Sequence, residues 1–148
     1  MSNTLIIRQP SKEEEFEAMY ELRWRVLRKP WNQPKGSEKD DLENQSFPFI
    51  AISDEKIIGT ARLQKNSEIE GQIRYLAINE EYRNQKIGRD LILFIEWYAS
   101  KKNCSYLKLN ARKTAHGFFI KQGYEIVGEG PTLFNEIEHY VMKKELKI

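Results

Sequence analysis

Residues 83–89 bring three basic side chains and one glycine together, in the order Arg-Asn-Gln-Lys-Ile-Gly-Arg. The apolar pattern predicts a strand before this segment and an amphipathic helix that begins within it. Unpaired N–H groups at a helix start, together with the helix dipole, favour an anion there. Gly88 has no Cβ, so the backbone can come close to a phosphate. We therefore expect the segment to bind a polyphosphate.

The elements that must position this segment follow from hydrophobic periodicity and turn signals. Strands are predicted at residues 4–9, 47–53, 57–65, 72–78, 106–110, 124–128 and 137–144. One helix is predicted to begin at the capping pattern of Ser11 and Glu14 and to stop at Pro30. Two more are predicted at residues 86–100 and 114–122. Residues 31–46 are polar and should form a loop with one helical turn near residues 38–42.

This order of elements indicates an α/β protein of the α+β type. Three consecutive strands in the middle form a meander, and the helical crossovers are too few for a doubly wound parallel sheet. We expect a mixed, mostly antiparallel sheet flanked by helices, in a single domain over residues 1–148.

The composition is that of an ordinary globular chain, with 40% hydrophobic residues. The 24 Lys and Arg residues against 22 Asp and Glu residues leave a net charge of +2, which argues against a nucleic-acid binder. The single cysteine, Cys104, allows no internal disulfide and favours a reducing compartment. No signal peptide or membrane span is visible, so we expect a cytoplasmic protein. No metal site is predicted.

Two motifs resemble those of the GNAT superfamily of N-acetyltransferases. Residues 83–88 read Arg-Asn-Gln-Lys-Ile-Gly, close to the family's Gln/Arg-x-x-Gly-x-Gly/Ala. Residues 115–124 read Ala-His-Gly-Phe-Phe-Ile-Lys-Gln-Gly-Tyr, similar to its second signature of a small residue, an aromatic pair and Gly-aromatic. The resemblance implies transfer of an acetyl group from acetyl-CoA, as co-substrate, to a primary amine. It also implies direct transfer in a ternary complex, and many relatives are homodimers.

The resemblance assigns a cofactor site to two parts of the chain. The backbone of residues 76–78 would hydrogen-bond the pantetheine arm as an added strand does, and the amides of residues 85–89 would hold the pyrophosphate. Lys86 replaces the middle glycine of the motif; we expect it to adopt helical φ and ψ and to add a Coulomb contact. The implied cofactor-binding residues are Leu76, Ala77, Ile78, Arg83, Asn84, Gln85, Lys86, Ile87, Gly88, Arg89, Arg112 and Phe119.

Acetyl transfer requires that the amine lose a proton, that the thioester carbonyl be polarised and that the leaving thiolate gain a proton. By resemblance, the N–H of Ile78 would polarise the carbonyl. Phe119 occupies the position where many relatives have a tyrosine as acid, and phenylalanine has no proton to give. Tyr124 and His139 are the remaining catalytic candidates, with Tyr75, water or an unassisted thiolate as alternatives. We expect catalysis to depend mainly on positioning.

The acceptor site should lie at the first helix and the loop after it. Residues 23–31 are basic and aromatic and could bind an acidic or aromatic group. The acids Glu38, Asp40, Asp41 and Glu43 could instead attract a cationic amine. The acceptor is a small molecule or a protein, with no nucleic acid or membrane partner expected. Two rival readings are a non-catalytic acyl-CoA-binding module and an interaction domain that uses the basic patch.

Overall fold

Seven strands form one sheet in the order β1-β2-β3-β4-β5-β7-β6 in the computed structural model, which describes residues 4–83 and 85–146. The β4–β5 pair is parallel and every other neighbouring pair is antiparallel. The predicted mixed, mostly antiparallel sheet is therefore confirmed. The strands are β1 Leu5–Arg8, β2 Phe47–Ser53, β3 Lys56–Lys65, β4 Glu70–Ile78, β5 Tyr106–Arg112, β6 Glu125–Glu129 and β7 His139–Glu145.

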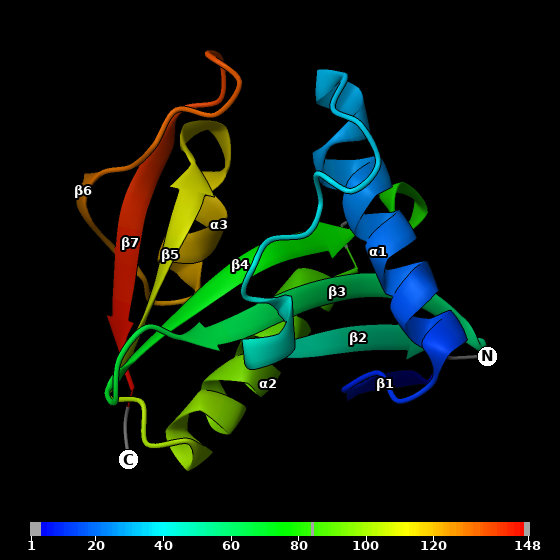
Figure 1. The fold of residues 1–148 in the computed structure, drawn as a ribbon. Coiled ribbons are helices and arrows are strands. Elements are labelled where there is room, and N and C mark those ends of the chain that lie inside the picture. Colours follow the sequence, from blue (N-terminus) through cyan, green and yellow to red (C-terminus); the bar gives the residue numbers. More distant parts are fainter. Residues whose placement is uncertain (1–3, 84, 147–148) are drawn as a thin grey trace.

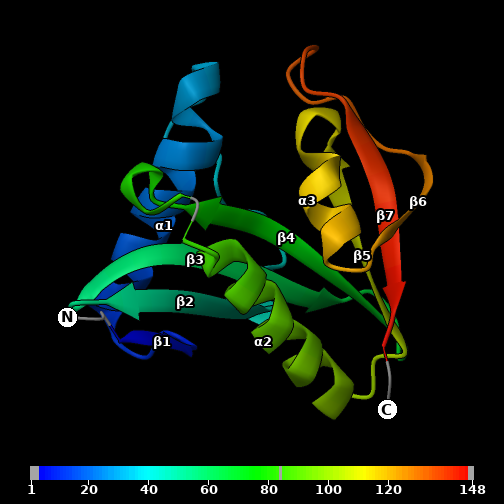
Figure 2. The same ribbon diagram turned by 180° about the vertical axis from the view of Figure 1, so that it is seen from behind.

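Helices cover both faces of the sheet. Helix α1 (Glu13–Leu27) lies on one face, and α2 (Ile87–Lys101) and α3 (His116–Lys121) lie on the other (Figures 1 and 2). Short 3-10 turns occupy Lys29–Trp31, Glu43–Gln45, Glu80–Tyr82 and Lys113–Ala115. Among the described helices, none is both long and apolar enough to cross a membrane.

The start of α1 differs from the predicted capping pattern. The carboxylate of Glu15, not of Glu14, accepts hydrogen bonds from the backbone N–H groups of Ser11 (2.8 Å) and Lys12 (3.3 Å). The helix begins at Glu13, so its third residue is Glu15, which is the position that can reach back to the unpaired N–H groups.

The helical turn predicted near residues 38–42 is also displaced. It forms at Glu43–Gln45 instead. The N–H of Leu42 donates to the Asp40 carboxylate at 2.9 Å, and the N–H of Asp40 donates to the Glu43 carboxylate at 3.1 Å. These side-chain bonds replace helical backbone bonds, as Asp residues commonly do in turns.

The main hydrophobic core lies between the sheet and α2. Ile87, Leu91 and Ile95 recur at helical spacing, and each is at most 4% exposed. Gly59 on β3 lets the start of α2 come close, because a Cβ there would lie 3.2 Å from side-chain atoms of Ile87 and Leu91. Burying each large aliphatic side chain contributes about 1.5 to 3 kcal/mol. This packing holds the start of α2 beside the end of β4.

A bulge in β4 opens the sheet in its middle. Arg74 pairs with Arg62 and Ala77 with Thr60, so β4 carries one residue more than β3 between these pairs. Tyr75 in the bulge has a φ of +58°, the left-handed region that a bulky residue rarely adopts. A bulge bends and twists its strand. The β4–β5 pairing stops at Ile73 and Leu109, and beyond it the two strands separate (Figure 1).

Candidate functional site

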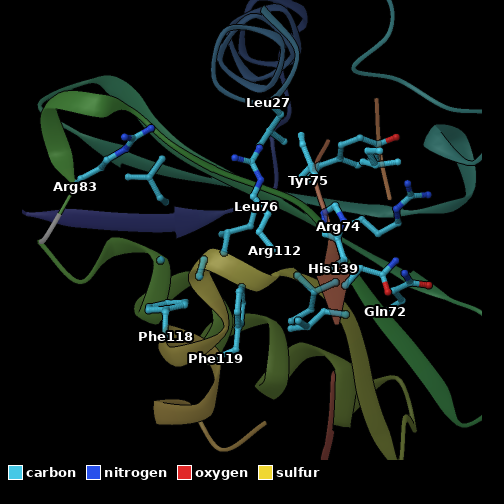
Figure 3. A pocket seen from close by; sticks show the side chains of 18 of the residues that line it. Leu27, Gln72, Arg74, Tyr75, Leu76, Arg83, Arg112, Phe118, Phe119 and His139 are labelled. Carbon is cyan, nitrogen blue, oxygen red and sulfur yellow. The ribbon is translucent and has the colours of Figure 1, made fainter. Parts of the chain in front are cut away.

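A cavity of about 760 Å³ occupies the opening between β4 and β5. This volume is typical of a small-molecule site. Its walls come from the end of α1, the second half of β4, the start of α2, the end of β5, α3 and the segment before β7 (Figure 3). The bulge and the separation of β4 from β5 therefore create the space, and the surrounding helices close it.

The start of α2 forms one end of the cavity, with Arg83, Lys86, Ile87 and Gly88 in its wall. Lys86 is the N-cap and has a φ of +63°, so the helical conformation expected for it is wrong. A glycine would adopt this φ without strain, which explains why the motif prefers glycine there. A Cβ on Gly88 would lie 3.4 Å from the Phe118 ring, an ordinary contact distance, so a small side chain would fit here.

The cavity brings together most of the predicted cofactor-binding residues. Those in its wall are Leu76, Ile78, Arg83, Lys86, Ile87, Gly88, Arg112 and Phe119. Ala77 is 1% exposed and its side chain packs in the core, so only its backbone could serve the predicted contact. Gln85 and Arg89 are not in the wall, and the Arg89 guanidinium forms an ion pair with Asp90 at 3.0 Å. Asn84 lies outside the described residues.

His139 lies in the wall at the other end of the cavity, directly opposite Arg112 in the β5–β7 register. It is 7% exposed, and its Nδ1 is 2.9 Å from the carbonyl oxygen of Pro131. Because a carbonyl can only accept, Nδ1 carries the proton. The Nε2 of the neutral ring then keeps a free lone pair, as a proton acceptor requires.

Tyr124, the other candidate, is not in the wall of this cavity. It is 1% exposed, and its hydroxyl donates to the Glu96 carboxylate at 2.9 Å. Lys144 donates to the same carboxylate at 3.0 Å. Burial first, and then the charge of Glu96, raise the pKa of Tyr124 above its ordinary value. Its hydroxyl thus has a structural partner on α2, while His139, Ile78 and Phe119 share the cavity.

Two of the four acids of the loop after α1, Asp40 and Glu43, are paired with arginines. Asp40 pairs with Arg62 at 2.7 Å and with Arg74 at 3.0 Å. Glu43 pairs with Arg62 at 2.6 Å and with Arg23 at 3.0 Å. The hydrogen bond from Arg62 is the main cause that lowers the pKa of Asp40 to about 2. None of the four loop acids is in the cavity wall.

Sequence reasoning missed two arginines, Arg62 and Arg74. They face each other in the β3–β4 register, and both guanidiniums lie 4.9 Å from the centre of the Tyr75 ring. The alternation of polar and apolar side chains along residues 60–64 was a usable signal. Polar residues at every second position of a central strand indicate a second, polar face, which here lies under α1.

Comparison with known proteins gives one family and several relatives. Residues 16–124 match the acetyltransferase (GNAT) family. The uncharacterized N-acetyltransferase YjcF of Bacillus subtilis is 28% identical over 133 residues, covering 90% of this chain and 94% of its own. The uncharacterized N-acetyltransferase YitI of the same organism is 28% identical over 137 residues, covering 88% and 92%.

Two solved structures share the fold. A protein from Lactobacillus plantarum superposes with a TM-score of 0.85 at 21% identity, covering 98% of this chain and all of that one (100%). An aminoglycoside 6'-N-acetyltransferase complexed with coenzyme A has a TM-score of 0.82 at 14% identity, covering 97% and 98%.

Proposed function

Because this chain belongs to the GNAT family of acetyltransferases and is an N-acetyltransferase, we propose that it transfers the acetyl group of acetyl-CoA to a primary amine of a small molecule or protein. Transfer is direct, with both substrates bound at once. One observation carries the proposal: a single cavity joins the start of α2 to the end that holds His139. Two substrates can meet in such a cavity without a covalent enzyme intermediate.

The cofactor half of the cavity suits a CoA thioester, which supplies an activated acyl group. Residues 74–78 of β4 run past the last β5 partner, so a pantetheine arm could take the place of the missing strand. The N–H groups of the first turn of α2 suit a pyrophosphate, and Arg83 and Lys86 add positive charge. Phe118 and Phe119 offer apolar contact beside them.

The backbone of Ile78 is suited to polarise the thioester carbonyl. The N–H of the next residue, Asn79, donates to the carbonyl of Ile58 on β3 at 2.8 Å. Successive N–H groups of an extended strand point in opposite directions, so the N–H of Ile78 points away from β3, toward the cavity side. A hydrogen-bond donor placed in advance at a developing negative charge is among the stronger catalytic effects.

His139 is the residue that we propose to take the proton of the amine. Its Nδ1 is held by the Pro131 carbonyl, which fixes the ring and leaves Nε2 as acceptor. Phe119 cannot protonate the thiolate, so the main acceleration comes from positioning the two substrates. In balance, the C–N bond forms, the C–S bond breaks, the amine gives up a proton and CoA leaves as the thiol.

Calorimetric titration with acetyl-CoA and CoA, followed by thiol release against a panel of amines, tests the proposal. We expect binding of both nucleotides and release with at least one class of amine. Binding without release from any amine would instead support the acyl-CoA-binding module. If neither nucleotide bound, the assignment of the cavity to CoA would be wrong.

A further inference from the structure

The cavity wall carries positive charge only. Among the described residues that form it, Arg28, Arg74, Arg83, Lys86 and Arg112 are basic, and none is an aspartate or glutamate. Arg83 and Lys86 lie at the cofactor end, where a pyrophosphate accounts for them. Arg28 and Arg74 are not needed for that purpose, and Arg112, which the resemblance assigns to the cofactor, lies nearer the middle of the cavity. In Figure 3, Arg112 stands in the middle of the cavity, with Arg83 on one side and Arg74 on the other.

Arg28 is held in place without neutralisation. It follows the last residue of α1, and its guanidinium donates to the carbonyl of Ser37 at 3.0 Å and to that of Leu27 at 3.2 Å. Carbonyl oxygens anchor the group but do not cancel its charge. Burial is the main cause that lowers the pKa of Arg28, and the positive charges of Arg74 and Arg23 lower it further.

Arg112 is in a similar position at the end of β5. Burial, followed by the positive charges of Arg28 and Arg83, lowers the pKa of Arg112. Its guanidinium lies 5.9 Å from the centre of the Trp31 ring. Two half-buried guanidiniums that repel each other are costly unless an anion joins them. Guanidinium groups bind carboxylates and phosphates with two parallel hydrogen bonds, which makes them suited to that anion.

The carboxylate of Asp40, from the loop after α1, binds other arginines. Asp40 uses both of its oxygens on Arg62 and one of them also on Arg74. Arg62 is fully buried on the face of the sheet that α1 covers. The loop acids therefore neutralise the buried arginines and leave Arg28 and Arg112 to a ligand.

We infer that the acceptor amine carries a carboxylate or a phosphate, and that Arg28 and Arg112 bind this anionic group beside His139. This inference rests on the proposed function, because it assigns the far end of the same cavity to the acceptor. Positive charge in the wall disfavours acceptors that bear several ammonium groups. Although an aminoglycoside 6'-N-acetyltransferase shares this fold, we therefore do not expect a polycationic acceptor for this protein.

The test uses amines that differ only in the anionic group. Thiol release from acetyl-CoA is measured with 4-aminobutyrate against butylamine, and with O-phosphoethanolamine against ethanolamine. Spermidine serves as the polycationic probe. We expect kcat/KM to be about tenfold to a hundredfold higher for the anionic member of at least one pair. The pair that responds distinguishes a carboxylate from a phosphate.

Variants separate recognition of the anion from general damage. Arg28→Gln should raise the KM of the preferred anionic amine about tenfold or more and leave the KM of acetyl-CoA unchanged. Arg28→Lys should recover part of the loss. Arg25→Gln is the matched control, because Arg25 lies three residues earlier, on α1, but pairs with Glu21 and Glu80 outside the cavity. It should behave as the wild type, and thermal melting checks that each variant folds.

The outcomes distinguish the two proposals. If butylamine and ethanolamine both release thiol at least as fast as their anionic partners, or if spermidine is the best acceptor, the inference is overturned and the proposed function stays intact. If no amine releases thiol, 4-aminobutyrate and O-phosphoethanolamine are titrated calorimetrically into the protein saturated with CoA. Binding that Arg28→Gln abolishes supports the anion site without catalysis, and no binding of either compound overturns it.

Discussion

The guanidinium of Arg62 faces the carboxylate of Asp40 with two hydrogen bonds, of 2.7 Å and 2.9 Å, although the residues are 22 positions apart. Asp40 comes from the loop after α1, and Arg62 from the middle of β3. The pair ties that loop to the sheet beside the cavity. It also removes from the acceptor end a carboxylate that the sequence had made available to a cationic amine.

Replacing Arg62 with methionine should destabilise the protein by about 3 to 5 kcal/mol, because Asp40 and Glu43 would lose a buried partner. Urea unfolding followed by tryptophan fluorescence measures the change. Arg25→Gln, which breaks only exposed ion pairs, should cost less than about 1 kcal/mol. If the two substitutions lowered the free energy of unfolding equally, the buried ion pairs of Arg62 would stabilise the protein no more than exposed ones do.

The same pair predicts a dependence of stability on acid pH. The pKa of Asp40 is lowered to about 2 in the folded protein, from an ordinary value of 3.8. A carboxylate whose pKa is lowered by folding stabilises the folded protein at pH values above its unfolded pKa. This stabilisation is lost as the pH falls through the folded pKa. The stability difference between wild type and Asp40→Asn should therefore shrink by about 1 to 2 kcal/mol between pH 5 and pH 2. Urea midpoints at several pH values measure it, and a constant difference would contradict the lowered pKa.

Lys86→Gly should leave folding stability within about 1 kcal/mol of the wild type, because glycine adopts the positive φ of this position freely but is more flexible when unfolded. The affinity for CoA should fall about fivefold at low salt and less at high salt, since an exposed charge contact is worth about 1 kcal/mol and is screened. Calorimetry at two salt concentrations makes the comparison. Lys121→Ala, on exposed helical surface, is the control, and an equal loss there would refute a specific contact.

His139→Gln should lower kcat about a hundredfold or more while the KM of acetyl-CoA stays unchanged, because glutamine cannot accept the amine's proton. The pH–rate profile should lose the limb that reports a basic group. A wild-type profile shape in a slower variant would assign His139 to positioning, and an unchanged kcat would exclude it from the chemistry.

Tyr124→Phe gives the opposite expectation. The hydroxyl that it removes bonds to Glu96, away from the cavity, so kcat should stay within about twofold of the wild type. Stability should fall by about 0.5 to 1.5 kcal/mol, the usual worth of one buried hydrogen bond. A large loss of kcat with unchanged stability would instead support Tyr124 as the acid that protonates the leaving thiolate.

Patterns close together along the chain made much of this protein predictable. The strands and helices lie within a few residues of their predicted positions, because alternation and helical spacing are local signals. The motif around Gly88 pointed to the start of α2 for the same reason. The displaced turn at Glu43–Gln45 and the left-handed Lys86 were missed, because each depends on side-chain bonds or on a single backbone angle.

The sequence by itself determined the family and the order of the elements, since these follow from short segments, and from the same segments it predicted a pyrophosphate site at the start of α2. Only the tertiary structure decided which charges reach the cavity. Basic and acidic residues were available to the acceptor end in similar numbers. The β3–β4 pairing placed Arg62 where it binds Asp40 and Glu43, while Arg28 and Arg112 lie in the cavity wall. Charge pairing between distant segments depends on the fold, so no local pattern could have shown it.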